Sequence, residues 1–194
     1  MEKSDIFIEQ VKQHPKAVSS GISWKMLGNA TGDRKILIQG QEFYVDLMET
    51  GPYYMETHRV RLVDGRFWRN DSETDIINSA LVNERFVEVT NIDKPINEII
   101  TLPNGDKVTV IGVIKNYKQA GPFQQVQPTV IHYPMDKQFK FLAIRGNSKE
   151  DLHEIDAYAK DQWESLETFM PYVSMFETQN IEGAINTNKS LKET

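Results

Sequence analysis

The chain has 194 residues, with 28 acidic and 22 basic side chains, and its formal net charge at pH 7 is −6. This acidic balance argues against a nucleic-acid partner, because phosphate binding requires a basic face. The chain contains no cysteine, and it has no apolar run near the roughly 20 residues that span a bilayer. Its length suits one domain or two small subdomains that need no disulfide or metal staple.

The first third of the chain predicts a helix followed by strands. Residues 4–13 predict a short helix, because Ser4 and Asp5 are N-cap types and Pro15 follows the segment. Residues 18–25 alternate loosely and predict a strand. Two further strands around a glycine-containing loop predict a hairpin, and a helical turn follows a Gly-Pro break. These three elements are expected at residues 35–38, 42–48 and 53–57.

The middle third predicts a helix and a second hairpin. Apolar side chains at 82, 86 and 89 have helical spacing, so residues 81–89 predict a helix that ends at Asn91. Asn104-Gly105 lies between two apolar runs, 99–102 and 107–114, and this pattern predicts a hairpin with a type I′ turn. The second run is apolar on both faces, which is typical of a central strand. Polar segments at 69–75 and 119–125 predict surface loops on either side of this module.

The last third predicts an alternation of strands and helices. Strands are expected at 129–133, 140–145 and 172–176, and a helix at 178–191. The clearest helix is 150–167, which has one apolar stripe, Ser148 as its cap and two acidic residues in its first turn. The order of elements predicts an α+β fold with a mixed sheet.

Five motifs in this order resemble the periplasmic core domain of MacB-type ABC transporter permeases. Leu62 to Phe67 is similar to the family's "L-GR-F" segment, and ALVNERFV, starting at Ala80, is similar to its "VNE-F" helix. A KPI loop and VTVIGVIKNYK are similar to the "PIG" loop and the "ViGVvkdf" strand. Gln127 to Ile131 is similar to a "-P-vi" segment. One departure is Asn97, which stands where family members often carry the glycine of Pro-Ile-Gly.

The resemblance implies a two-lobed fold. A membrane-proximal α+β body, similar to the family's Porter lobe, would comprise 1–72 and 119–194. An inserted helix-and-hairpin lobe, similar to its Sabre lobe, would comprise 73–118. Both would lie on the periplasmic side of the bacterial inner membrane.

The resemblance also implies that ATP-driven motion passes into this domain for export or mechanotransmission. The implied partners are the parent transmembrane helices and an ATPase, with a periplasmic adaptor, lipoprotein or peptide as further candidates. We expect the isolated domain to be a monomer and the full-length protein to be a dimer. The first helix and the last would lead toward the membrane.

No pattern in the chain indicates an enzyme, a cofactor or a metal site. There is no nucleophile elbow and no glycine-rich phosphate loop. The four histidines share no ligand spacing, which favours structural or surface roles. Glu84 stands at a helix start, where an acidic group is favoured. We therefore predict no catalytic, cofactor-binding or metal-binding residues.

The candidate interaction residues are aromatic. Phe67 and Trp68, like Tyr53-Tyr54, could line a peptide or lipid groove, although side chains of this size more often lie in a core. Phe123 stands in a polar Gly-Pro loop, where a core role is less evident. These aromatic residues keep a second hypothesis open, namely a free-standing periplasmic module that binds a peptide or glycan.

Overall fold

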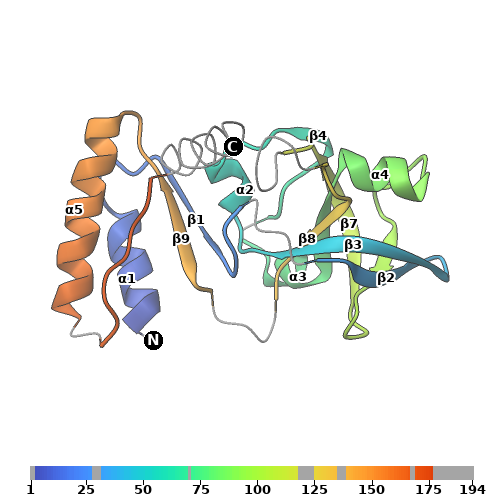
Figure 1. Cartoon of the computed structure of the whole chain (residues 1–194), viewed down its shortest axis with the longest axis horizontal. Coiled ribbons are helices and arrows are strands. Elements are labelled where there is room, and N and C mark those ends of the chain that lie inside the picture. Colours follow the sequence, from blue (N-terminus) through green and yellow to red (C-terminus); the bar gives the residue numbers. More distant parts are fainter. Residues whose placement is uncertain are drawn as a thin grey trace, which may run out of the picture. The chain divides into compact units, whose positions relative to one another are not determined.

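The computed structural model of the chain describes residues 3–27, 32–69, 71–117, 125–134, 139–166 and 169–176. The fold is α+β with a mixed sheet, which confirms the predicted class (Figure 1). Contacts between residues divide the chain into two compact units. The helical unit contains 3–18, 146–166 and 169–176 of the described residues. The sheet unit contains 19–27, 32–69, 71–117, 125–134 and 139–145.

The helices are α1 (Lys3–Lys12), α2 (Tyr54–Thr57), α3 (Glu73–Asn78), α4 (Glu84–Thr90) and α5 (Lys149–Ser165). The strands are β1 (Ser19–Ser23), β2 (Arg34–Ile38), β3 (Gln41–Glu49), β4 (Leu62–Gly65), β5 (Ser79–Asn83), β6 (Ile99–Thr101), β7 (Lys107–Ile114), β8 (Thr129–His132) and β9 (Phe141–Arg145). Both longer predicted helices, 4–13 and 150–167, are confirmed within two residues at each end.

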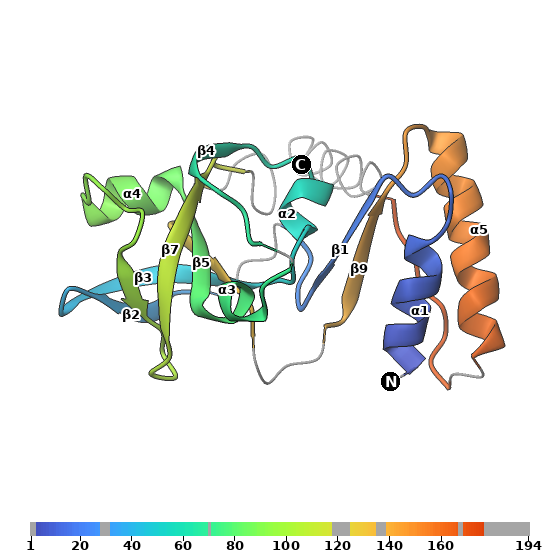
Figure 2. The same ribbon diagram turned by 180° about the vertical axis from the view of Figure 1, so that it is seen from behind.

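In the helical unit, α1 and α5 lie side by side and run in opposite directions (Figures 1 and 2). Lys3 Nζ donates a hydrogen bond to the carbonyl oxygen of Leu166 at 2.6 Å. At the other end of the pair, Lys16 Nζ lies 2.6 Å from a carboxylate oxygen of Glu154. Val11 is completely buried. The start of α1 and the end of α5 therefore lie at one end of this helix pair.

The predicted strand at 172–176 is wrong, since these residues form no regular secondary structure. The segment that follows α5 instead makes hydrogen bonds with that helix. Trp163 Nε1 donates to the carbonyl oxygen of Met170 at 2.7 Å, and the Tyr172 hydroxyl donates to Asp156 Oδ1 at 2.7 Å. The predicted helix at 178–191 lies outside the described residues.

In the sheet unit, the strands pair in the order β4-β7-β5-β8-β3-β2-β6, and β6 pairs with β7 as well. The pairings therefore close on themselves, with β4 outside the ring. The pairs β3–β8 and β5–β7 are parallel and the other pairs are antiparallel. β7 pairs with β4, β5 and β6, which confirms the prediction that this strand is central.

Two clusters of buried side chains form the core of the sheet unit. The first, which we call the ring core, includes Ile36, Val45, Val82, Val110 and Val130 from the strands of the ring, with Phe86 of α4. The second joins Met48, Met55, Trp68 and Ile131. Burial of so many large apolar side chains is the main favourable contribution to the stability of this unit.

The remaining two strands, β1 and β9, form an antiparallel pair of their own. Ser19 is the register partner of Arg145 at the end of this pair. In the described part of the chain, the backbone passes between the helical and sheet units twice, at 18–19 and at 145–146. Both passages therefore adjoin the same residue pair of the sheet unit.

The helix predicted over 81–89 is partly wrong. Residues Ser79–Asn83 form strand β5, all five of them are buried, and α4 starts only at Glu84. A short apolar run does not distinguish a buried strand from a helix. Here the pairing of β5 with both β7 and β8 decides in favour of the strand. The predicted end at Asn91 is confirmed, because Asn91 adopts the left-handed conformation that ends α4.

The hairpin β6–β7 is confirmed, but its turn is not type I′. A type I′ turn requires positive φ at both central residues, whereas Gly105 has φ +92° and Asn104 is not among the residues with positive φ. Gly105 N donates to the Leu102 carbonyl and Leu102 N donates to the Asp106 carbonyl. Pro103 fixes a negative φ, so the turn is a type I turn followed by a left-handed glycine.

The predicted surface loop at 69–75 is partly wrong, because α3 starts at Glu73 and is capped by Ser72. The predicted lobes, 1–72 with 119–194 and 73–118, stay a prediction. The two compact units of the structure have other bounds, and β5 and β7 of the predicted insert pair with β4 and β8 of the predicted body.

Candidate functional site

Asn83, the central residue of the VNE motif, is completely buried and connects three segments. Its Oδ1 accepts hydrogen bonds from Phe86 N, which caps α4, and from Thr129 N, which begins β8, both at 2.9 Å. Its Nδ2 donates to the Gln127 carbonyl at 2.8 Å. A buried amide with its donor and acceptor both engaged stabilises one arrangement of these segments. The VNE and "-P-vi" motifs therefore meet at this side chain.

Glu84 follows Asn83 and connects the start of α4 to the end of β7. Its carboxylate pairs with Lys115 Nζ and accepts a hydrogen bond from Asn116 N at 3.0 Å. These contacts lower the pKa of Glu84 below its usual value, the Lys115 ammonium contributing most. Asn116 Oδ1 accepts in return from Arg85 N at 2.9 Å. Glu84 is thus a structural residue at a helix start, which confirms the prediction made for it.

Two glycines of the motifs face each other where β4 pairs with β7. Gly65 and Gly112 are register partners. A Cβ atom on Gly65 would overlap the carbonyl oxygen of Ile111, and one on Gly112 would overlap that of Arg66. Gly65 also has a positive φ of 72°, which glycine adopts without strain. The glycines of the "L-GR-F" and "ViGV" motifs therefore allow the backbones of β4 and β7 to approach each other closely.

Asn97 forms a tight turn without glycine. Its φ is +73°, and Glu98 N donates to the Pro95 carbonyl at 3.2 Å, so Asn97 occupies the third position of a four-residue turn. A type II turn requires positive φ at this position, and asparagine tolerates this conformation better than most non-glycine residues. Asn97 therefore allows a tight turn at this position.

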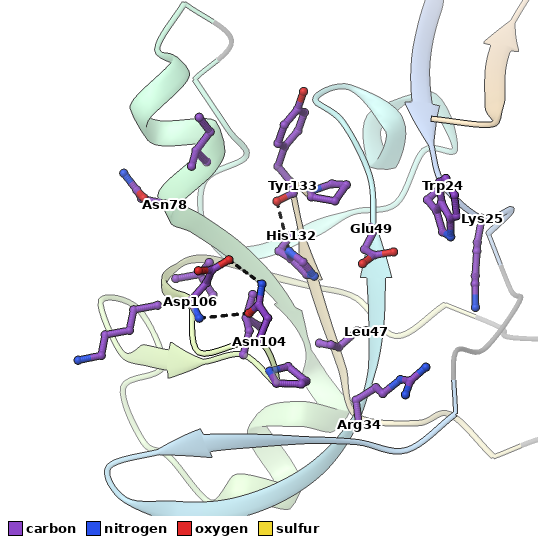
Figure 3. A pocket seen from close by; sticks show the side chains of 16 residues that line it. Trp24, Lys25, Arg34, Leu47, Glu49, Asn78, Asn104, Asp106, His132 and Tyr133 are labelled. Atoms are coloured by element: carbon purple, nitrogen blue, oxygen red, sulfur yellow. Dashed lines mark hydrogen bonds between the residues drawn. The ribbon is translucent and has the colours of Figure 1, made fainter. Parts of the chain in front are cut away.

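A cleft of about 450 Å³ opens in the sheet unit, and Figure 3 shows its lining side chains. Leu47 packs against the ring core, and Leu102 and Val108 are part of it. These three side chains supply apolar lining of the cleft, which we call its floor. The side chain of Asn78, just before β5, also lines the cleft, whereas α4 begins at the other end of that strand. The cleft and α4 therefore lie at opposite ends of the ring.

The sides of the cleft carry aromatic and charged groups. The aromatic residues are Trp24 and Tyr133, the basic residues are Lys25, Arg34 and Lys107, and the acidic residues are Glu49 and Asp106. His132 is 7% exposed and is the register partner of Glu49 on the neighbouring parallel strand. Asp106 accepts a hydrogen bond from Asn104 Nδ2 within the β6–β7 turn. No local sequence pattern indicates this cleft, because its lining comes from segments far apart in the chain.

Of the predicted interaction residues, Phe67 and Trp68 do not line this cleft. Trp68 is 4% exposed in the second core cluster, and Phe67 is half-buried against the same cluster. Tyr54 is also buried, whereas Tyr53 is 48% exposed with a left-handed backbone. Phe123 lies outside the described residues. A role of Phe67, Trp68 and Phe123 in binding stays a prediction.

Within the described residues, no cluster of three or more histidine, aspartate and glutamate side chains has the geometry of a metal site. Burial raises the pKa of two carboxyl groups, those of Asp46 and Glu56. Neither belongs to the part of the chain that lines the cleft. No helix in the described ranges has the length and apolarity needed to cross a bilayer.

Comparison with known proteins agrees with the motifs. The model of the MacB-like periplasmic core domain matches residues 4–166. The extracellular domain of the noncanonic ABC-type transporter YknZ from Gram-positive bacteria is similar in structure. It has a TM-score of 0.65 at 14% identity and covers 89% of this chain and 88% of its own.

The periplasmic region of MacB from Actinobacillus actinomycetemcomitans has a TM-score of 0.66 at 11% identity, over 98% of this chain and 83% of its own. Comparison with curated proteins gave no significant match. The fold and the motifs thus define an extracytoplasmic domain of an ABC transporter permease. The chain belongs to the family of MacB-like periplasmic core domains.

Proposed function

We propose that the domain transmits ATP-driven motion from the membrane part of a MacB/FtsX-type permease into the periplasm, and that it does so without chemistry of its own. Membership of the family supports a position of this domain on the periplasmic side of the membrane. Transmission of motion is supported by the two described passages between the units, which both adjoin one residue pair, Ser19 with Arg145. A displacement of the helical unit would then act on the sheet unit through two neighbouring strands.

The sheet unit is suited to move as one body. Strands β2, β3, β5, β6, β7 and β8 close into a ring. Asn83 connects α4 with β8 through a buried hydrogen bond, and Glu84 connects it with the end of β7 through an exposed one. Close-packed cores resist deformation, so a force applied at one end reaches the other. Coupling of this kind requires two states that nucleotide binding favours differently, and it requires no catalytic residue in the domain.

In the full-length protein we propose a dimer whose copies change their separation during the ATPase cycle, with the parent transmembrane helices and an ATPase as obligatory partners. An adaptor, a lipoprotein or a peptide cargo remains a further proposal. The isolated domain is proposed to be a monomer, because its dimer contacts come from the membrane and ATPase parts.

The test is to insert a flexible Gly-Ser linker of about six residues at 18–19 and at 145–146 in the parent transporter. We expect ATP hydrolysis to continue while export or force transmission falls to background. The control is the same linker in the exposed β2–β3 turn at Gln39-Gly40, which leaves the two passages unchanged. Full activity of the doubly extended protein would contradict transmission through these strands.

A further inference from the structure

The cleft in the sheet unit has an apolar floor and lies at the end of the ring opposite α4. Leu47, Leu102 and Val108 supply the floor, and Trp24 and Tyr133 add aromatic surface. Ligand pockets have volumes of roughly 300–1,000 Å³ and are found at the mouths of closed sheets. The volume of about 450 Å³ falls within this range. The cleft is therefore large enough for a small organic molecule.

Two basic side chains lie on one side of the cleft, those of Lys25 and Arg34 (Figure 3). Within the described residues, neither side chain donates a hydrogen bond or forms an ion pair, although Lys25 favours the charged form of Asp46. Lys35, the neighbour of Arg34 on β2, differs because its ammonium lies 3.0 Å from the Glu42 carboxylate. The cleft thus offers two cations that are available to an anion.

The acidic groups occupy other parts of the cleft. Asp106 lies at the β6–β7 turn, where it accepts a hydrogen bond from Asn104. Glu49 points into the middle of the cleft beside His132 (Figure 3). An anion is therefore favoured at Lys25 and Arg34 and disfavoured near Glu49, whereas an apolar body is favoured on the floor.

We propose that this cleft binds small amphipathic anions. A carboxylate, sulfonate or phosphate head would lie beside Lys25 and Arg34, and the apolar body would cover Leu47, Leu102 and Val108. The inference concerns the sheet unit alone. It stands independently of the proposed force transmission, and it can be tested on the 194-residue chain without a transporter.

The experiment compares two fluorescent probes that share an apolar body. Anilinonaphthalene sulfonate carries one negative charge, and N-phenylnaphthylamine carries none. Both are titrated into the full chain at pH 7 and low salt, and decanoate serves as a non-fluorescent competitor, with decanol as its neutral counterpart. We expect the sulfonate to bind and decanoate to displace it, whereas decanol displaces it at least about fivefold less well. Added salt should weaken the binding of the sulfonate.

Charge variants locate the probe. Arg34→Gln and Lys25→Gln should each weaken binding of the sulfonate by about threefold to fivefold and leave the neutral probe unchanged. Glu49→Gln should strengthen it by a similar factor. Lys35→Gln is the matched control, because it removes a neighbouring charge that is already paired. Melting curves of each variant distinguish a lost site from a lost fold.

Three results would overturn the proposal. One is the absence of saturable sulfonate binding, and another is equal affinity for the charged and neutral probes. The third is unchanged sulfonate affinity in a folded variant that carries both Arg34→Gln and Lys25→Gln. None of these outcomes depends on transport, so failure here would leave the proposed function of the domain untouched.

Discussion

The side-chain oxygen of Asn83 lies 2.9 Å from the backbone nitrogen of Thr129, which is 46 residues further along the chain. This contact joins the end of β5 to the start of β8 in the interior of the sheet unit. The same oxygen caps α4 through Phe86 N. One buried amide therefore determines where a helix begins and where a strand begins.

Replacing Asn83 tests this role. Asn83→Ala would remove the side-chain acceptor shared by Phe86 N and Thr129 N and one of the donors to the Gln127 carbonyl, so we expect a loss of about 2–4 kcal/mol in the free energy of unfolding. Asn104→Ala is the control, since Asn104 is exposed in the β6–β7 turn, and its cost should stay below about 1 kcal/mol. Chemical denaturation measures both. Equal losses of unfolding free energy in the two variants would contradict a particular contribution of the buried Asn83 contacts to stability.

Alanine substitutions at Gly112 and Gly105 distinguish the cost of steric overlap from the cost of backbone strain. A Cβ on Gly112 would overlap the Arg66 carbonyl, so Gly112→Ala should cost about 3 kcal/mol. Gly105 has φ +92° and open space around it, so Gly105→Ala should cost only about 1 kcal/mol through strain. Thermal unfolding of both variants gives the comparison. A larger loss at Gly105 than at Gly112 would contradict the close approach of β4 and β7.

Replacing Asn97 by glycine should give a small gain in stability. Since it occupies a left-handed position, Asn97→Gly should raise the free energy of unfolding or leave it unchanged, within about 1 kcal/mol. Asn97→Ala should lower it by about 1 kcal/mol. Denaturant midpoints of the three proteins give the order Gly, Asn, Ala. A more stable alanine variant would mean that the turn is not as described.

The ion pair between Arg66 and Asp75 predicts a pH dependence. Arg66 donates two hydrogen bonds to this carboxylate, which together with Arg69 N lowers the pKa of Asp75 to about 2. The folded-state pKa is thus below the unfolded value of about 3.9. The stabilisation is fully present above about pH 4 and is lost as the pH falls toward 2.

Asp75→Asn should therefore be less stable than the native chain by about 1–2 kcal/mol at pH 7. The difference should shrink on acidification and vanish near pH 2. Urea unfolding at several pH values measures it. A difference that is constant between pH 7 and pH 2 would assign the loss to packing instead of charge.

Local chemistry made much of the fold predictable. The helix of α5 follows from its apolar stripe and the Ser148 cap, and the β6–β7 hairpin follows from Asn104-Gly105 between two apolar runs. The type of that turn was missed, because Pro103 restrains φ just before Asn104. β5 was missed because five buried residues are too few to show a period, and only the neighbouring strands determine their conformation.

The sites were less predictable than the elements. The family motifs contain Asn83 and Thr129, but the structural junction that these residues form depends on a contact that no local pattern contains. The cleft is harder still, since Arg34 and His132 line it from strands separated by about a hundred residues of sequence. Trp68 shows that a motif residue chosen as a candidate interaction residue can instead lie in the core.

The most direct test of force transmission is a distance measurement in the parent permease, reconstituted with its ATPase and stripped of other cysteines. A single cysteine at the exposed Lys160 would carry a spin label, and pulsed electron paramagnetic resonance would report the distance between the two copies. This domain contributes no cysteine of its own. We predict that the distance distribution shifts between the nucleotide-free and the ATP-bound transporter. An identical distribution in both states would contradict the proposal that the domain moves with the ATPase cycle.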